Sequence, residues 1–168
     1  MPRYATCDLQ MLRGTDATYV VKEFSVYDPS WDTDRTRLFA PPYSEATLSP
    51  KIRRHNNYVT SYIHGISWHA GDIPYTLCEE TIQNMITKYA IVYVKGEEKR
   101  RILQWILQDV DVVNIGTLGF PKLDNLPKLC VWTGIAEHHT HATRHRVHNT
   151  AKKHHGRRHY RQFAFRSD

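Results

Sequence analysis

The chain has 168 residues, a length typical of a single domain that can bury a substantial core. It contains no uninterrupted apolar run near the roughly 18 residues that a membrane-spanning helix needs, and its N-terminus lacks the apolar core of a signal peptide. Three cysteines, widely spaced and odd in number, favour reduced thiols over a disulfide framework. We therefore expect a cytoplasmic or nuclear protein with no membrane partner.

The net charge of +6 is concentrated at one end of the chain. Residues 144–168 contain eight Lys and Arg against one acid, which gives +7 and leaves −1 for residues 1–143. A near-neutral body with a cationic tail indicates a polyanion binder, although a solvated, partly disordered terminus explains the same composition. We divide the chain into one domain, residues 1–150, and a basic His/Arg-rich tail, residues 151–168.

Three strands are predicted in the N-terminal part of the chain. Residues 3–9 are compatible with a first strand, and residues 18–27 are rich in the β-branched and aromatic side chains of a second. The turn residues at 14–16 favour an antiparallel hairpin between them. Residues 29–37 are polar and predict a loop, and residues 37–40 predict a short third strand that two prolines end.

The middle of the chain is less regular. Residues 44–54 predict a helical turn that Pro50 interrupts, and residues 56–63 fit either a strand or a helix. Residues 67–75 predict a loop. Apolar residues at helical spacing predict a helix over residues 76–88.

The next elements alternate between strand and helix. Residues 90–94 form a short apolar run that predicts a buried strand. Residues 97–108 predict a helix with a buried stripe of Ile102, Trp105 and Ile106, and Leu103 is a further candidate for it. Residues 110–115 predict another strand. Residues 123–132 have an apolar face and predict a last helix that starts near Pro127, and residues 138–149 are compatible with its continuation. This order predicts an α/β fold: a mixed sheet with antiparallel N-terminal strands and parallel later strands, flanked by helices, as in the RNase H-like architecture.

The stretch from residue 62 to residue 103 carries the most specific pattern. It contains the turn His64-Gly65-Ile66-Ser67, followed by the predicted helix, buried strand and second helix. This arrangement resembles the DEDDh 3′–5′ exonucleases, in which a His-Gly-Ile-Thr turn precedes the same elements. The resemblance implies an RNase H-like fold and hydrolysis of phosphodiesters by two Mg²⁺ or Mn²⁺ ions, held by four acids and assisted by a general-base His. A simpler interpretation of the turn is a glycine at positive φ.

At the positions of the first three family acids this chain keeps only one carboxylate. The family's Asp-x-Glu motif corresponds to Asp8-Leu9-Gln10, in which Gln10 replaces the Glu. The acid of the second motif lies four residues before a Leu in the family, and counting back from Leu103 gives Lys99. An ammonium at Lys99 would repel a divalent ion and could itself supply the positive charge that the metal supplies in the family.

The family's last motif, His-x-Ala-x-x-Asp, fits two registers here. With Ala142 on the motif alanine, Thr140 takes the place of the His and His145 that of the Asp. In the other register, Arg144 takes the place of the His and Asn149 that of the Asp. The resemblance therefore places Asp8, Gln10, Lys99, His145 and Asn149 around a cleft in which most of the acids are missing.

Eight of the eleven histidines lie between residues 138 and 159. On a helix, His141, His145 and His148 would share one face, a spacing that can hold zinc or a similar metal. The simpler interpretation is a polar face that becomes more cationic below about pH 6.5.

The C-terminal segment interleaves cations with aromatic residues. Arg and Lys can bind phosphates, and Tyr or Phe can stack on unpaired bases. The predicted nucleic-acid-binding residues are Arg144, Arg146, Lys152, Lys153, Arg157, Arg158, Tyr160, Arg161 and Arg166. Alternatively, Phe163 and Phe165 pack back on the body as a last strand.

These patterns favour a nucleic-acid-binding protein, for RNA more than DNA, on a catalytically degenerate DEDDh exonuclease-like scaffold. The first alternative is an active exonuclease that needs Mg²⁺ or Mn²⁺ and uses relocated acids drawn from Asp8, Glu97, Glu98, Asp109 and Asp111. The second is a protein-interaction module, such as a viral or mobile-element accessory protein, that forms a defined oligomer. The sequence leaves the oligomeric state open.

Overall fold

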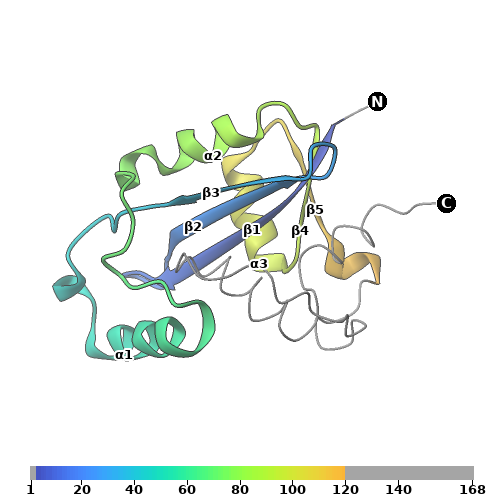
Figure 1. Cartoon of the computed structure of the whole chain (residues 1–168). Helices are drawn as coiled ribbons and strands as arrows, with labels where there is room; N and C mark the ends of the chain where they lie inside the picture. The colour runs from blue at the N-terminus through green and yellow to red at the C-terminus, as the bar shows by residue number, and fades with distance from the viewer. Residues whose placement is uncertain (1–2, 120–168) are drawn as a thin grey trace, which may run out of the picture.

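A five-stranded mixed sheet forms the centre of residues 3–119, the part of the chain that the computed structural model describes (Figure 1). The strands are β1 (Tyr4–Arg13), β2 (Tyr19–Asp28), β3 (Thr33–Leu38), β4 (Ile91–Val94) and β5 (Asp111–Asn114). Their spatial order is β3-β2-β1-β4-β5. The first three strands pair antiparallel, whereas β4 runs parallel to β1 and β5 parallel to β4. The expected α/β fold with a mixed sheet flanked by helices is thus confirmed.

The first hairpin is longer than the sequence predicted. Strand β1 continues to Arg13, four residues past the predicted end, and pairs with β2 over its whole second half. The turn between them places Asp16 and Ala17 at positive φ. The register shifts after Gln10, because Gln10 faces Glu23 while Met11 faces Val21, so Lys22 is the extra residue of a β-bulge.

The third strand lies earlier than predicted. It spans Thr33–Leu38, most of which the sequence assigned to a loop, and not residues 37–40. The sequence did not predict this strand because its side chains are mostly polar. Its backbone pairs with β2 along the sheet edge, and Ser25 Oγ lies 2.9 Å from Thr36 Oγ1. Phe39, just after it, is fully buried.

Helix α1 (Pro50–Val59) begins at the proline that was expected to interrupt it. Pro50 is in the first turn, where its missing N–H costs nothing, and the Ser49 hydroxyl caps the helix by accepting from the Ile52 amide at 3.3 Å. A wider turn, η2 (Thr60–His64), continues α1 and ends at Gly65 with φ +79°. Residues 56–63 are therefore helical, and the simpler interpretation of the His-Gly-Ile-Ser turn, a glycine at positive φ, is confirmed.

Two more helices pack against one apolar core with the sheet. They are α2 (Cys78–Ile86) and α3 (Glu97–Ile106), and short 3-10 turns cover Glu45–Thr47, Tyr75–Leu77 and Ile115–Leu118. Leu103 and Ile106 are the buried residues of α3. The predicted burial of Trp105 is wrong: its side chain is 66% exposed, because it lies outside the arc of α3 that Leu103 and Ile106 turn toward the core.

A second, smaller core fixes α1 to the far end of the β1–β2 hairpin. Leu12, Val20, Leu48 and Trp68 are its buried members. The side chain of Asn56, fully buried on α1, accepts from the Arg13 amide and donates to the Arg13 carbonyl, both at 2.8 Å. These two bonds replace the strand partner that the end of β1 would otherwise need.

Candidate functional site

One face of the sheet carries polar side chains, and the opposite face packs in the main apolar core. Residues that pair directly across antiparallel strands point to the same face. Asp8 pairs with Ser25, Gln10 with Glu23, and Ser25 with Thr36. We call these residues the polar sheet face: Asp8, Gln10, Glu23, Ser25 and Thr36.

Asp8 is the centre of the polar contacts on this face. Its Oδ1 accepts from the Lys99 ammonium at 2.5 Å and from the Leu9 amide at 3.0 Å, and its Oδ2 accepts from Gln10 Nε2 at 3.0 Å. Gln10 is almost fully buried, whereas the Asp8 and Lys99 side chains keep 24% and 20% of their surface exposed. The Asp8–Lys99 pair can therefore be reached from solvent.

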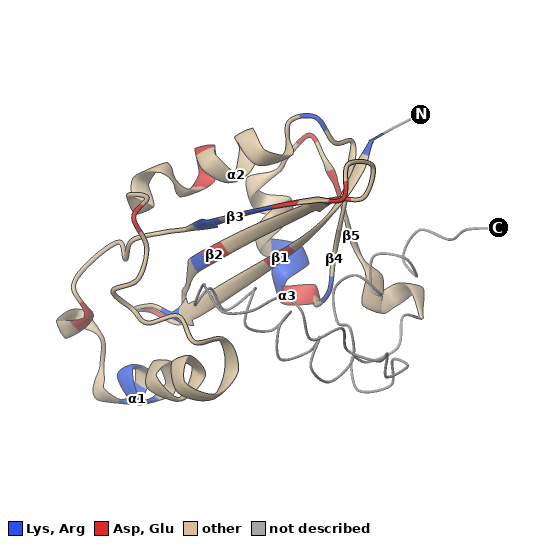
Figure 2. Cartoon of the chain, viewed as in Figure 1, with Lys and Arg blue, Asp and Glu red and all other residues tan. Residues whose placement is uncertain are grey.

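The ends of the strands bring Lys99 to Asp8. Strand β4 pairs with β1 only over Tyr4–Thr6, so Asp8 lies beyond the end of β4. Helix α3 starts at this point, after Gly96, and carries Lys99 in its first turn. Figure 2 shows the acid of β1 beside the basic part of α3. Ligand sites in open α/β sheets lie beyond the carboxyl ends of parallel strands. The pair lies just beyond the carboxyl end of β4, beside the middle of β1.

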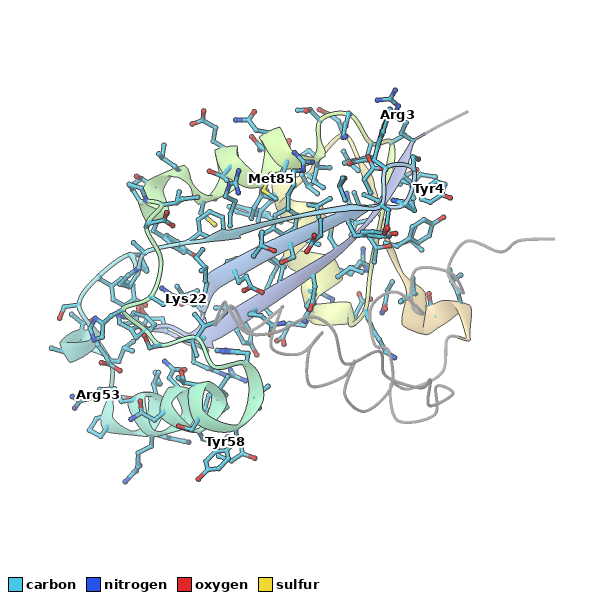
Figure 3. All side chains as sticks on the ribbon, viewed as in Figure 1. Arg3, Tyr4, Lys22, Arg53, Tyr58 and Met85 are labelled. Carbon is cyan, nitrogen blue, oxygen red and sulfur yellow. The ribbon has the colours of Figure 1, made fainter. Side chains whose placement is uncertain are left out.

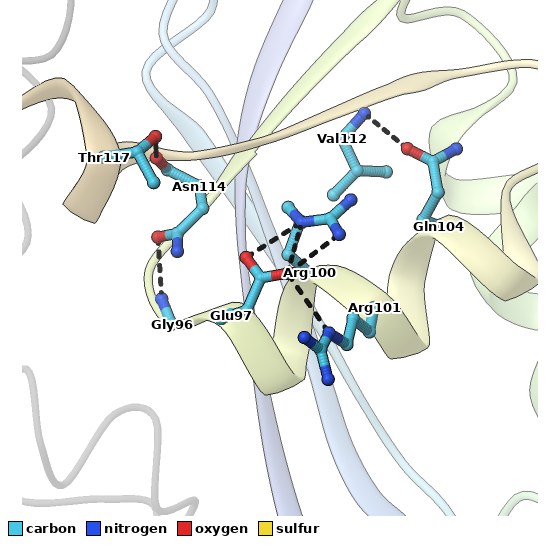
Figure 4. A network of polar contacts seen from close by, with 8 residues as sticks. All are labelled: Gly96, Glu97, Arg100, Arg101, Gln104, Val112, Asn114 and Thr117. Carbon is cyan, nitrogen blue, oxygen red and sulfur yellow. Dashed lines mark hydrogen bonds and ion pairs between the residues drawn. The ribbon is translucent and has the colours of Figure 1, made fainter.

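Polar contacts with β5 hold the start of α3 in place (Figure 4). The Asn114 side chain at the end of β5 accepts from the Gly96 amide at 3.0 Å. Further along α3, Gln104 Oε1 accepts from the Val112 amide at 3.3 Å. Because both ends of the helix are tied to β5, the position of Lys99 is set by the sheet.

The acids proposed as relocated metal ligands do not gather around Asp8. Arg100 and Arg101 bind the carboxylate of Glu97, and the bond from Arg100 lowers the pKa of Glu97 to about 2. Glu98 contacts the Tyr19 hydroxyl and so raises the pKa of Tyr19. Asp109 and Asp111 are exposed, in the turn after α3 and at the start of β5.

The described residues of this site do not fit a divalent ion. Asp8 directs one oxygen to an ammonium and the other to the amide NH₂ of Gln10, since an ionised carboxylate can only accept. Mg²⁺ and Mn²⁺ require several oxygen ligands. Among residues 3–119, no group of three or more His, Cys, Asp or Glu side chains could hold a metal.

Glu23 belongs to this site and was missed in the sequence. It is fully buried and lies directly across from Gln10. The signal was present: Glu23 and Ser25 alternate with Phe24 and Val26, which gives one polar and one apolar face in the second strand. The face of Glu23 could not be assigned from the sequence, because the β-bulge at Lys22 interrupts the alternation of the two faces along the strand.

The remaining predicted site residues lie outside the described residues. These are His145 and Asn149 of the last motif, the candidate metal ligands His141 and His148, and the basic residues from Arg144 to Arg166. The boundary at residue 150 and the predicted last helix also lie there. Asp8, Gln10 and Lys99 are thus the predicted site residues that the structure brings together.

A scan against protein-family models and a search of curated proteins give no match to this chain. Within residues 3–119, no helix is both long enough and apolar enough to cross a membrane. The functional interpretation therefore depends on the geometry of the site and the charge of the chain.

Proposed function

We propose that this chain binds nucleic acid, RNA in preference to DNA, on a DEDDh exonuclease-like scaffold with an RNase H-like fold that no longer performs metal-dependent hydrolysis. The observation that carries the proposal is the Asp8–Lys99 ion pair, which lies in the middle of β1, just beyond the carboxyl end of β4. The ammonium of Lys99 lies against the one acid that the first motif retains. The Lys99 ammonium, held beside Asp8, can attract a phosphate as a metal ion would.

The strand order supports the scaffold part of the proposal. A three-stranded antiparallel meander continued by parallel strands β4 and β5 is the arrangement expected of an RNase H-like sheet. The His64-Gly65 turn and the helix–strand–helix series that follows it agree with the same scaffold.

The distribution of charge along the chain supports nucleic acid as the ligand. The cationic segment from residue 144 to residue 168 attaches seven net positive charges to a body that is close to neutral. Lys and Arg in this number favour a phosphate backbone as partner. The aromatic residues among them suit unpaired bases, which RNA presents more often than DNA does.

The experiment replaces Lys99 by Met in the full-length protein and measures binding of a labelled single-stranded RNA by fluorescence anisotropy. We expect the dissociation constant to rise about fivefold or more, since the variant lacks the ammonium that binds a phosphate. The matched control is Lys88→Met, because Lys88 also pairs with an aspartate, Asp28, at 3.1 Å, but just after the end of α2. Unchanged binding by Lys99→Met, or an equal loss in both variants, would contradict the proposal.

The exonuclease alternative receives no support from the described residues, since the acids it needs are dispersed. Incubation of labelled RNA with the wild-type protein and Mn²⁺, with Asp8→Ala as control, tests it directly. The interaction-module alternative predicts a defined oligomer that purifies with a low ratio of absorbance at 260 to 280 nm, the wavelengths of nucleic acid and protein.

A further inference from the structure

Helix α1 presents a surface that the proposed site does not use. Its outward side carries Lys51, Arg54 and Tyr58, and Tyr62 follows on the wider turn η2. These four residues, spaced three or four apart and therefore on one side of the helix, are called the α1 stripe. Arg53, elsewhere on the helix, is also exposed.

The inner side of α1 fixes this surface in place. Asn56 binds both backbone groups of Arg13, and Ile52 and Val59 pack against the second core. The opposite side is therefore turned outward, and Figure 3 shows Tyr58 projecting from the side of α1 that faces away from the sheet. A rigid helix face is a better binding platform than a mobile loop because little freedom is lost on binding.

Two tyrosines on the stripe form an exposed aromatic pair. Tyr58 and Tyr62 keep 57% and 78% of their surface exposed, and their ring centroids are 5.1 Å apart with a tilt of 36°. Large aromatic side chains usually bury their rings. Two adjacent exposed rings offer the flat apolar surface on which unpaired bases stack.

The segment that carries the pair has charges of one sign. No Asp or Glu occurs between Glu45 and Asp72, a stretch that contains Lys51, Arg53 and Arg54. Figure 2 shows basic and no acidic residues on α1. Within residues 3–119, these three cations take part in none of the ion pairs, so their charge is available to a polyanion.

We infer that the α1 stripe is a binding site for single-stranded nucleic acid, with bases stacked on Tyr58 and Tyr62 and phosphates held by Lys51 and Arg54. An acidic protein surface can also pack on exposed tyrosines, but adjacent rings next to cations match the alternating bases and phosphates of a single strand. The inference adds a second surface to the proposed function and does not depend on the Asp8–Lys99 pair.

The test measures the affinity of full-length variants for labelled oligonucleotides of about 15 nucleotides. Replacing both tyrosines, Tyr58→Ala with Tyr62→Ala, is expected to weaken binding about tenfold or more, because neither position can then stack on a base. Replacing both by Phe preserves stacking and is expected to change the dissociation constant by less than about twofold. Trp31→Ala is the matched control, since Trp31 is 68% exposed but lies at the β2–β3 turn.

Three oligonucleotides of one sequence show which form of nucleic acid the α1 stripe binds. Single-stranded RNA and single-stranded DNA are both expected to lose affinity in the alanine variant, and the larger loss identifies the preferred strand. A duplex is expected to bind the variant and the wild type equally, because paired bases offer no free face. Ultraviolet crosslinking of the wild-type complex, mapped by mass spectrometry, is expected to place crosslinks on Tyr58 or Tyr62.

The outcomes for the two proposals are distinguishable. If the alanine variant binds like the wild type and crosslinks fall elsewhere, this inference is overturned while a loss in Lys99→Met still supports the proposed function. If only the alanine variant loses affinity, the α1 stripe is supported and the site at Asp8 is not. A wild-type protein that binds none of the oligonucleotides overturns both.

Discussion

Lys22 lies at the β-bulge of β2 and is fully buried, which is uncommon for a lysine. Its ammonium donates to the carbonyl oxygens of Phe39, Trp68 and Ala70 at 2.6, 2.8 and 2.8 Å. All three N–H groups are thereby used. Burial lowers the pKa of Lys22 to about 8, so the group still carries its charge at neutral pH. One side chain thus connects β2 to the segments that follow β3 and precede α2 (Figure 3).

Replacing Lys22 by Met is expected to lower the free energy of unfolding by about 2–4 kcal/mol, because three buried carbonyls are deprived of a charged donor at once. Urea unfolding followed by circular dichroism measures the change. The control, Lys51→Met, alters an exposed lysine and should stay within about 0.5 kcal/mol of the wild type. A similar small effect at Lys22 would show that the three hydrogen bonds contribute little.

Asp28 provides a pH-dependent interaction at the end of β2. Burial alone would raise the pKa of Asp28, but hydrogen bonds from the Tyr89 hydroxyl at 2.7 Å and from Lys88 outweigh it and lower the pKa below 3.8. A carboxylate with a lowered pKa in the folded state stabilises the protein above its unfolded pKa. That stability is lost as the pH falls through the folded pKa.

The wild-type protein is therefore expected to be more stable than Asp28→Asn at neutral pH, and the difference in unfolding free energy should shrink as the pH falls below 3.8. Urea unfolding of both proteins across this pH range measures it. A difference that stays constant or grows in acid would contradict the assignment.

At the scale of elements, the position of α1 depends on one side chain. Asn56 makes the two bonds to Arg13 that join the helix to the hairpin, while its neighbour Asn57 is exposed. The rest of the packing is the small apolar core around Leu12 and Trp68. The two bonds of Asn56 and this second core thus fix the helix that carries the proposed α1 stripe.

Asn56→Ala is expected to cost about 1–3 kcal/mol of stability, since the Arg13 amide and carbonyl no longer have a partner. Hydrogen exchange should accelerate in α1 more than in α2 or α3, because the helix then opens locally. Asn57→Ala is the matched control and should leave both measurements close to the wild type. Uniform acceleration over all helices would show instead that the whole domain is destabilised.

The elements predicted correctly were those whose pattern is local. The β1–β2 hairpin, β4 and α3 follow from β-branched runs, a turn and helical spacing. Strand β3 was misplaced because an edge strand with polar side chains lacks the apolar alternation of a strand. Pro50 was interpreted as an interruption because the sequence does not show where the first turn of a helix begins.

At the scale of the whole molecule, the distribution of charge determines how binding should respond to salt. The body is nearly neutral and the segment from residue 144 onward carries +7. Each neutralised phosphate releases counterions, so affinity falls as salt rises, with a slope set by the number of phosphates bound. Steep salt dependence should therefore belong to this segment more than to the body.

Replacing its six arginines by Gln is expected to reduce the slope of log K against log salt by about 0.7 for each phosphate of a single strand that the variant no longer neutralises. The positions are Arg144, Arg146, Arg157, Arg158, Arg161 and Arg166. Anisotropy titrations of labelled RNA at several salt concentrations measure the slope, and Arg37→Gln, an exposed arginine of β3, serves as control. An unchanged slope would show that this segment does not bind the nucleic acid.

The candidate site was predictable in part. Asp8, Gln10 and Lys99 follow from the motif resemblance, because each belongs to a short pattern that can be recognised along the chain. Glu23 and the α1 stripe did not follow, because the first depends on the register of the hairpin and the second on which side of α1 packs inward.

The sequence by itself determined the charge segregation, the alternation of strands and helices, and the candidate residues on each element, because these depend on neighbours along the chain. The tertiary structure decided that Asp8 meets Lys99, 91 positions away, that Asn56 binds Arg13, and that Tyr58 remains exposed. Such contacts depend on strand order and register, and these are fixed only when the whole core packs.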